Sequence, residues 1–160
     1  SGKCELFSDA LAAQGLDPVA GYVPPLEGPT SNPELAQRFP LAFISPPAHH
    51  FLNSTFSAQP TLVRREKEQR LVIHPRDAES RAIRDGELVR TWNDRGAFLA
   101  RAEVSGAARP GVVVGLATWW PKMCPGGTNV NAVTSQETSD LGGGATFYDV
   151  LVQVEPAPPA

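Results

Sequence analysis

Two loops of this chain concentrate side chains that donate and accept hydrogen bonds. The first follows an apolar run and carries Ser45, His49, His50 and Asn53. The second is rich in glycine and carries Asn129, Asn131, Thr134, Ser135, Gln136, Asp140, Gly142 and Gly143. Amides and hydroxyls can both donate and accept, and glycine lets a backbone approach a ligand closely. The inventory favours binding of a large heteroaromatic or phosphorylated molecule, although the same residue types are common in any loop.

Metal binding and hydrolysis are weaker interpretations of the same residues. His49 and His50 are adjacent, so on an extended chain they point to opposite faces, and no further ligands follow at a spacing typical of zinc sites. Ser135, His49 and Asp140 could form a Ser-His-Asp arrangement, but no G-x-S-x-G nucleophile elbow supports it. We therefore expect neither a metal ligand nor a catalytic residue in this chain.

The elements that would position these loops are clearest between Leu71 and Val104. Residues 71–73 form a β-branched run, typical of a buried strand. A proline then favours the first turn of a short helix, which we expect to end at Asp85-Gly86. Strands over 87–93 and 97–104 follow, joined by a turn at residues 93–96. Together with later strands this unit predicts a core containing Leu71, Ile73, Val89, Phe98, Val104, Val113, Val150 and Val152.

Further short strands are expected over residues 41–44, 112–117 and 147–155. Six strands with one or two short helices predict a small closed barrel, since closure removes exposed strand edges. The mixed-sign charged run at 64–70 is interpreted as a solvated loop or hairpin tip. Residues 122–144 form a loop long enough to be functional or disordered, and we expect it to be among the most mobile parts of the free chain.

Composition limits the class of protein. The 160 residues suit one domain, and a net charge of −3 offers no basic footprint for nucleic acid. No apolar run approaches the roughly 20 residues of a transmembrane helix. The two cysteines, Cys4 and Cys124, suggest no disulfide framework, which favours a reducing compartment such as the cytoplasm but leaves the localisation unknown.

The first forty residues differ from the rest. A short amphipathic helix is expected over residues 5–14, followed by five prolines between positions 18 and 33. Such proline density suits an extended chain laid over a surface. Because the chain does not begin with methionine, we interpret it as a piece of a longer protein and residues 1–40 as a lead-in.

Several short motifs, in a fixed order, resemble one known family. The strand from Pro40 to Ser45 and its histidine-containing loop open the pattern, and residues 93–96 match its turn before a long strand. The other pieces are His74 to Ala78, similar to "N-P-x-D-A", Asp85 to Val89, similar to "D-G-D-x-V", Pro110 to Val113, similar to "P-G-V-V", and Asn129 to Thr134, similar to "N-x-N-x-L-T". The chain resembles the carboxy-terminal molybdopterin-dinucleotide-binding domain of the dimethyl sulfoxide reductase superfamily of oxidoreductases.

The resemblance implies a mainly β fold, a double-psi six-stranded barrel over residues 41–156, with 1–40 as a lead-in from a preceding domain. It also implies contact with molybdopterin guanine dinucleotide, the molybdenum or tungsten being held by the parent enzyme. The implied contacts are Ser45, His49, His50 and Asn53 in the first loop, and the eight listed polar and glycine residues in the second.

The family has Thr-Gly-Arg in place of residues 45–47 as a common variant, so in this loop no arginine is available to fork onto a pterin or phosphate oxygen, and the histidines or the backbone would have to do so. Implied partners are the other domains of the catalytic subunit and an iron–sulfur electron-transfer subunit, and the fragment alone is expected to be inactive. The alternative is a stand-alone barrel that binds proteins or peptides.

Overall fold

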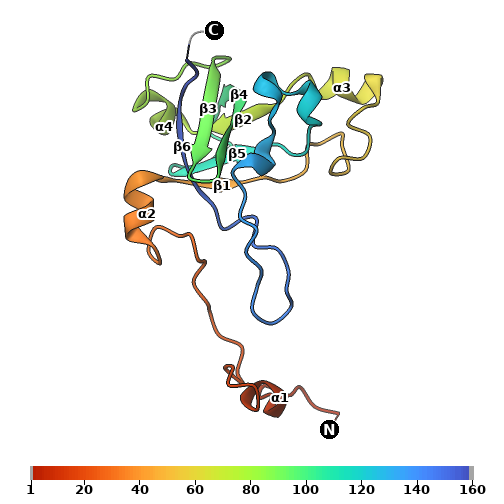
Figure 1. Ribbon diagram of the computed structural model, residues 1–160, viewed down its shortest axis with the longest axis vertical. Helices are drawn as coiled ribbons and strands as arrows, with labels where there is room; N and C mark the ends of the chain where they lie inside the picture. The colour runs from red at the N-terminus through yellow and green to blue at the C-terminus, as the bar shows by residue number, and fades with distance from the viewer. Residues whose placement is uncertain (1, 159–160) are drawn as a thin grey trace.

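The computed structural model describes residues 2–158, and its centre is a closed barrel of six strands in the order β1-β5-β2-β4-β3-β6 (Figure 1). The strands are β1 (Leu41–Ile44), β2 (Arg70–Ile73), β3 (Leu88–Asn93), β4 (Gly96–Val104), β5 (Val112–Gly115) and β6 (Leu151–Pro156). The predicted mainly β, six-stranded double-psi barrel is confirmed.

Two of the strand pairs are parallel, β1 with β5 and β2 with β4, and the other four are antiparallel. Phe43 lies opposite Val113, and Leu71 lies opposite Ala102. Parallel strands require crossover connections rather than hairpins. Since β1 and β5 run in the same direction, the loops that follow them leave the same end of the barrel.

The barrel interior is filled by the residues that alternate inward along the strands. Phe98 and Phe43 are both nearly inaccessible, and their ring centroids lie 5.8 Å apart. The predicted inward face of β4 is confirmed, with Phe98, Ala100 and Ala102 buried while Arg101 is exposed. Of the eight predicted core residues, seven are fully buried and Val104 is partly buried against them.

The helices are short and lie outside the barrel. They are α1 (Asp9–Ala12), α2 (Pro33–Arg38), α3 (Pro60–Glu66), α4 (Pro75–Glu79) and the 3-10 turns η1 (Pro121–Met123), η2 (Pro125–Gly127) and η3 (Val130–Ala132). The expected helix over residues 5–14 is therefore reduced to one turn. The helix after His74 ends earlier than predicted, because Ala82 takes a left-handed conformation with φ of 53°.

The charged run at residues 64–70 was predicted to be a solvated loop or hairpin tip, and this was wrong. Its first half is the last turn of α3. Glu66 and Gln69 point inward and are buried, while their neighbours Arg65 and Lys67 remain in solvent. Apolar side chains of α3, Leu62 and Val63, pack against Phe51 and Trp119 in a small second core outside the barrel.

The long loop at 122–144 is also more structured than expected. It contains the three 3-10 turns, and Val130 and Val133 are completely buried in the barrel core. Beyond Val133 the chain leaves the barrel as a hairpin, closed by pairing of Thr138 with Ala145. Strand β6 starts at Leu151 rather than at Phe147, since Phe147 and Tyr148 lie exposed on the returning limb.

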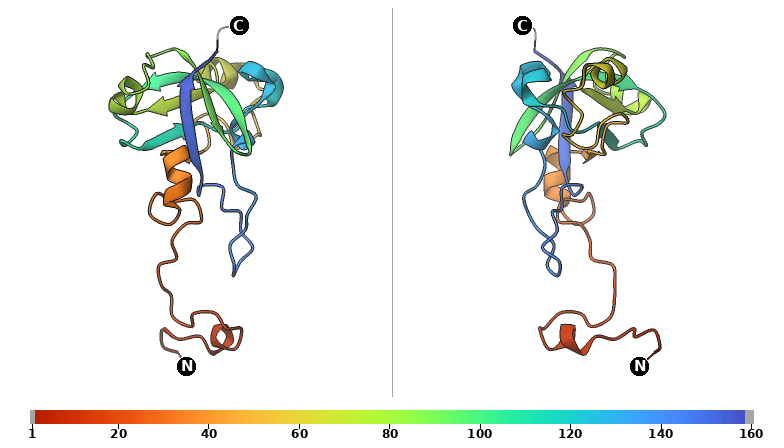
Figure 2. Two further views of the ribbon diagram at one scale, coloured as in Figure 1. Left: turned by 60° about the vertical axis from the view of Figure 1, so that its left-hand side comes forward. Right: turned by 90° about the vertical axis from the view of Figure 1, so that its right-hand side faces the viewer.

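The amino-terminal region forms an arm that extends away from one end of the barrel (Figures 1 and 2). Helix α2 connects the arm to β1 and contacts β6, and Phe39 after it is buried against Trp92 at a centroid distance of 5.3 Å. The hairpin of residues 135–149 descends from the same end of the barrel as the arm (Figure 2). Over residues 2–158, no helix has the length and apolar character needed to cross a membrane.

Candidate functional site

The strand directions bring four segments together at one end of the barrel. β1, β3 and β5 all finish there, and β6 begins there, because β6 runs antiparallel to both β1 and β3. The loop after β1, the β3–β4 turn, the loop after β5 and residues 131–149 are therefore neighbours. Two cavities lie among them and share one lining residue, Asn131.

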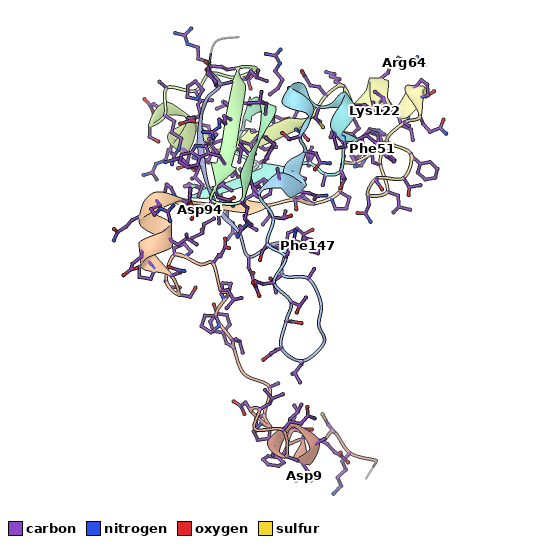
Figure 3. The ribbon with its side chains drawn as sticks, viewed as in Figure 1. Asp9, Phe51, Arg64, Asp94, Lys122 and Phe147 are labelled. Carbon is purple, nitrogen blue, oxygen red and sulfur yellow. The ribbon has the colours of Figure 1, made fainter. Side chains whose placement is uncertain are left out.

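The smaller cavity, of about 430 Å³, lies between the loops that follow the two parallel strands β1 and β5. A parallel bridge between Pro47 and Ala117 joins these loops. The polar groups of the cavity include Ser45, Asn53 and Asn131, all predicted from the sequence, and Thr118. Phe147, which is labelled in Figure 3, and Tyr148 form an aromatic wall, with their ring centroids 4.5 Å apart.

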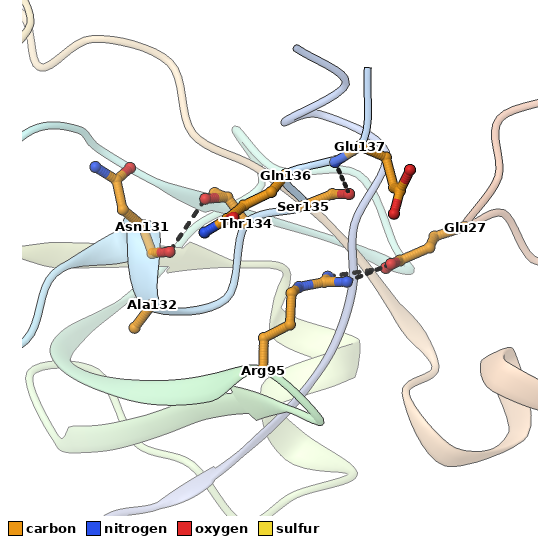
Figure 4. Close-up of a pocket in the computed structure, with 8 residues that line it drawn as sticks. All are labelled: Glu27, Arg95, Asn131, Ala132, Thr134, Ser135, Gln136 and Glu137. Carbon is orange, nitrogen blue, oxygen red and sulfur yellow. Dashed lines mark hydrogen bonds and ion pairs between the residues drawn. The ribbon is translucent and has the colours of Figure 1, made fainter. Parts of the chain in front are cut away.

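The larger cavity, of about 700 Å³, is lined mainly by polar side chains of the second predicted loop (Figure 4). Its lining residues are Glu27, Arg95, Asn131, Ala132, Thr134, Ser135, Gln136 and Glu137. Thr134 Oγ1 donates to the Asn131 carbonyl at 3.1 Å, and Ser135 Oγ accepts from the Glu137 amide at 3.1 Å. These bonds fix the backbone of the loop while the amide group of Gln136 stays at the cavity surface.

Three charged residues of this cavity, Glu27, Arg95 and Glu137, were missed by sequence reasoning, and the first two form a pair. Arg95 lies in the predicted turn between β3 and β4, and its guanidinium points into the cavity (Figure 4). It donates in bidentate fashion to the Glu27 carboxylate, with Nη2 to Oε2 at 3.0 Å. Residues 45–54 contain no arginine, but the β3–β4 turn brings one to the larger cavity. One signal in the sequence could have identified Arg95: it lies in the turn that follows β3, a strand that ends at the site.

Asn93 holds this corner of the site from inside. Its side chain is buried, and its Nδ2 donates to the carbonyls of Val133 at 2.9 Å and Leu151 at 3.1 Å. Its Oδ1 accepts from the Arg95 amide at 3.0 Å. Arg95 Nε also donates to the Val133 carbonyl, at 2.9 Å. One buried amide thus joins the β3–β4 turn, the loop after η3 and the start of β6.

His49 and His50 line neither cavity. His49 is exposed, and its ring packs edge-on against His50 at 4.8 Å. The Nδ1 atom of His50 lies 2.7 Å from Oε1 of buried Glu66, which also accepts from the His50 amide. His50 is thus hydrogen-bonded to a buried carboxylate, away from the cavities.

Asn129 is likewise occupied within the barrel. Its Nδ2 donates to the Trp119 carbonyl at 2.7 Å, and its Oδ1 accepts from the Asn131 amide at 3.1 Å. Both polar atoms of the side chain serve to shape the loop, which places Asn131 at the junction of the two cavities. Asn129 acts on the site through the backbone rather than by lining it.

Asp140, Gly142 and Gly143 lie at the tip of the hairpin. Asp140 Oδ1 accepts from the adjacent Leu141 amide at 2.8 Å, and Gly143 has a φ of 61°, which a turn requires. Asp140 lines a separate, more apolar cavity between the hairpin and residues 23–26 of the arm. These three residues are thus separated from Asn131 and its neighbours.

The described residues also bear on the alternative chemistries. Among residues 2–158 no cluster of three or more His, Cys, Asp or Glu side chains could hold a metal ion. Ser135, His49 and Asp140, the members of the imagined triad, lie respectively in the larger cavity, beside His50 and Glu66, and at the hairpin tip. What the two cavities offer is hydrogen bonding from amides and hydroxyls, an aromatic wall and one guanidinium.

Comparison with known proteins identifies the family of this chain. The family model described as "Molydopterin dinucleotide binding domain" matches residues 41–151. "Probable oxidoreductase YoaE" of Bacillus subtilis (strain 168) is 39% identical over 155 residues, covering 97% of this chain and 22% of that protein. "Dimethyl sulfoxide reductase DmsA" of Escherichia coli (strain K12) is 32% identical, covering 97% of this chain and 20% of that protein.

A solved structure shares the fold. "Acetylene Hydratase from Pelobacter acetylenicus" superimposes with a TM-score of 0.82 over 98% of this chain and 24% of its own, at 23% sequence identity. This chain spans about a fifth of the length of the curated relatives just named. Neither the family match nor these relatives support a stand-alone protein-binding module. The chain belongs to the family of molydopterin dinucleotide binding domains, those of the dimethyl sulfoxide reductase superfamily.

Proposed function

We propose that this chain forms one wall of the bis(molybdopterin guanine dinucleotide) pocket in a larger molybdenum or tungsten oxidoreductase. The observation that carries the proposal is the pair of adjoining polar cavities at the end of the barrel where β1, β3 and β5 finish. Molybdopterin guanine dinucleotide is the cofactor of this family, and every lining residue of the two cavities except Glu27 lies within the matched residues 41–151. The redox chemistry comes from the cofactor and the metal it carries, whereas this chain supplies binding.

The residues at the cavities fit such a group. A pterin or guanine edge presents donors and acceptors side by side, which amides such as Asn131 and Gln136 can match. The aromatic rings of Phe147 and Tyr148 offer a flat surface to a heteroaromatic ring. Ser45, Asn53, Thr134 and Ser135 supply further hydroxyl and amide groups. The proposal assigns no direct cofactor contact to the predicted residues that line neither cavity: His49, His50, Asn129, Asp140, Gly142 and Gly143.

In this function the chain orients the cofactor and excludes water from it. Asn93 and Asn129 hold the β3–β4 turn and the loop after η3 with paired hydrogen bonds. The groups that face the cavities are therefore already in place before a ligand arrives, and less ordering is needed on binding. The wall is built from rigid barrel ends rather than from the projecting hairpin tip.

The parent enzyme and its partners belong to the same proposal. The relatives of this chain are about five times longer, and we propose that further domains of one catalytic subunit close the pocket. We also propose that residues 1–40 lead from a preceding domain into the barrel of residues 41–156, and that an iron–sulfur subunit exchanges electrons with the parent. The isolated chain has no turnover in this account.

The test uses the full-length parent enzyme with Asn131→Ala. Asn131 lines both cavities, and loss of its hydrogen bonds costs about 1–3 kcal/mol of binding. We expect cofactor content to fall, measured as GMP released on acid hydrolysis per mole of protein together with bound metal. The fall should be about tenfold where loading is limited by affinity.

The matched control is Gln14→Ala, which removes an exposed side-chain amide on the arm that donates to the Ala10 carbonyl at 3.1 Å. This variant should keep the wild-type GMP and metal content. Wild-type content in the Asn131 variant as well would exclude the cavities as the cofactor wall.

A further inference from the structure

The contact between Glu27 and Arg95 has the chemistry of an oxyanion bound by the barrel. Two kinds of donor from the barrel converge on the Glu27 carboxylate: the fork of Arg95 and the backbone amide of Leu151, at 3.2 Å from Oε2. Glu27 itself lies in the proline-rich part of the arm, between Pro25 and Pro29 and ahead of α2. Figure 4 shows it entering the cavity from outside the barrel.

The donors are fixed by the barrel and not by Glu27. Arg95 Nε donates to the Val133 carbonyl at 2.9 Å. The peptide group that carries the Leu151 amide is fixed by its own carbonyl, that of Val150, which accepts from the Phe43 amide at 2.9 Å. The guanidinium fork therefore keeps its direction without the arm. A carboxylate and a phosphate oxygen pair make the same bidentate contact with arginine. A phosphate has enough oxygens to accept from Leu151 as well.

The geometry points to a phosphate-type oxyanion site at Arg95 and Leu151 that Glu27 fills in the free chain. Arm docking through Glu27 and binding of a phosphate or diphosphate group are then mutually exclusive. The inference rests on the proposed function in so far as a dinucleotide carries such a diphosphate. It goes beyond that function because it couples the arm to loading of the site.

A second carboxylate, that of Glu137, also lines the cavity, and its charge weakens the binding of any anion there by repulsion. It is exposed and has no contact with the Arg95 fork among the hydrogen bonds and ion pairs of residues 2–158. Its repulsion of a bound anion is therefore screened by water and salt and is small. Comparing substitutions of Glu27 and Glu137 therefore distinguishes competition for the Arg95 fork from simple charge repulsion.

The experiment measures pyrophosphate binding to the 160-residue chain by NMR, following the Arg95 Nε–H resonance and the Leu151 amide. The Glu27→Gln substitution removes the competing carboxylate and should tighten pyrophosphate binding by about tenfold. That is the gain when the fraction of molecules with a free Arg95 fork rises from about a tenth to nearly all. The charge-matched Glu137→Gln should change it by about twofold or less. Arg95→Lys, which keeps the charge but loses the fork, should lose most of the binding.

A second readout follows the arm. Pyrophosphate added to the wild-type chain should shift the backbone amide resonances of Val23, Leu26, Glu27 and Gly28 toward their positions in the Glu27→Gln variant, since coupling between two sites is reciprocal. Equal tightening by the two glutamine variants, or no response of Arg95 Nε in either variant, would overturn the inference. Failure here leaves the Asn131 test of cofactor content untouched, and a positive result here does not depend on it.

Discussion

The Nδ1 atom of His50 lies 2.7 Å from Oε1 of Glu66, a carboxylate whose side chain is only 3% exposed. The same carboxylate accepts from the His50 amide and lies 3.8 Å from Arg70, which in turn pairs with Glu103 at 2.6 Å. The loop after β1 is thus tied to the end of α3 by a buried anion. That loop carries Ser45 and Asn53 of the smaller cavity.

Glu66→Ala should therefore destabilise the chain. The substitution leaves the His50 donors and part of Arg70 without their acceptor, which costs about 1–3 kcal/mol. The free energy of unfolding in urea is the measurement. Glu68→Ala is the matched control, since Glu68 is 49% exposed and pairs with Arg101 only at the surface, where such pairs contribute about 1 kcal/mol or less. Equal losses in the two variants would contradict a buried role for Glu66.

Phe98→Ala tests the barrel core. Phe98 is 1% exposed and packs against Phe43, so truncation should lower the free energy of unfolding by about 3–5 kcal/mol. Phe147→Ala removes the same ring from a position that is 42% exposed and should change stability little. A near-zero effect of Phe98→Ala on the unfolding midpoint would show that the ring does not face the core.

Gly115→Ala tests whether the loop after η2 is part of the barrel. A Cβ at Gly115 would lie 2.7 Å from Cε2 of Phe43 and 3.0 Å from Cγ1 of Val130. Overpacking of this kind costs about 1–3 kcal/mol, whereas Gly106→Ala meets no atom within 4 Å and should be close to neutral. If Gly115→Ala were equally neutral by thermal unfolding, Val130 would not be packed there.

Cys124 should be a slow thiol. Burial raises its pKa from 9.0 to about 11, so roughly one molecule in a thousand carries the reactive thiolate at pH 8. In a Cys4→Ser chain, Ellman's reagent should react slowly at pH 8 and faster as the pH approaches 11. Because the pKa of Cys124 is raised in the folded chain, its contribution to the free energy of unfolding is fully present below pH 9 and is lost as the pH rises toward 11. Rapid labelling of the folded chain at pH 8 would contradict the burial.

Strand periodicity made the barrel predictable. The alternation through residues 97–104 identified the inward face that Phe98 and Ala100 occupy, and the turn at 93–96 lies where its residue types placed it. Local pattern could not identify Glu66 or Val130 as buried. Each sits in a polar or glycine-rich stretch, and its burial depends on partners far away in the sequence, namely His50 and Gly115.

The candidate site was predictable only where composition and topology agree. Ser45, Asn53, Asn131 and the run from Thr134 to Gln136 follow strands that end at one side of the barrel, and they line the two cavities. Asn129 and His50 have suitable chemistry but use it inside the domain. Arg95 and Glu27 were missed because their pairing joins positions 68 residues apart, which no local pattern reports.

The most direct test of the central claim is hydrogen exchange of the full-length parent enzyme, purified with its cofactor and from a host that cannot make it. Amides of residues 129–133 should exchange slowly in both forms, because Val130 and Val133 are buried in the barrel. Amides at Ser45, Asn53 and residues 134–137 should become protected only in the loaded enzyme. Unchanged exchange at those positions, with protection confined to other domains, would contradict the account of these cavities as the cofactor wall.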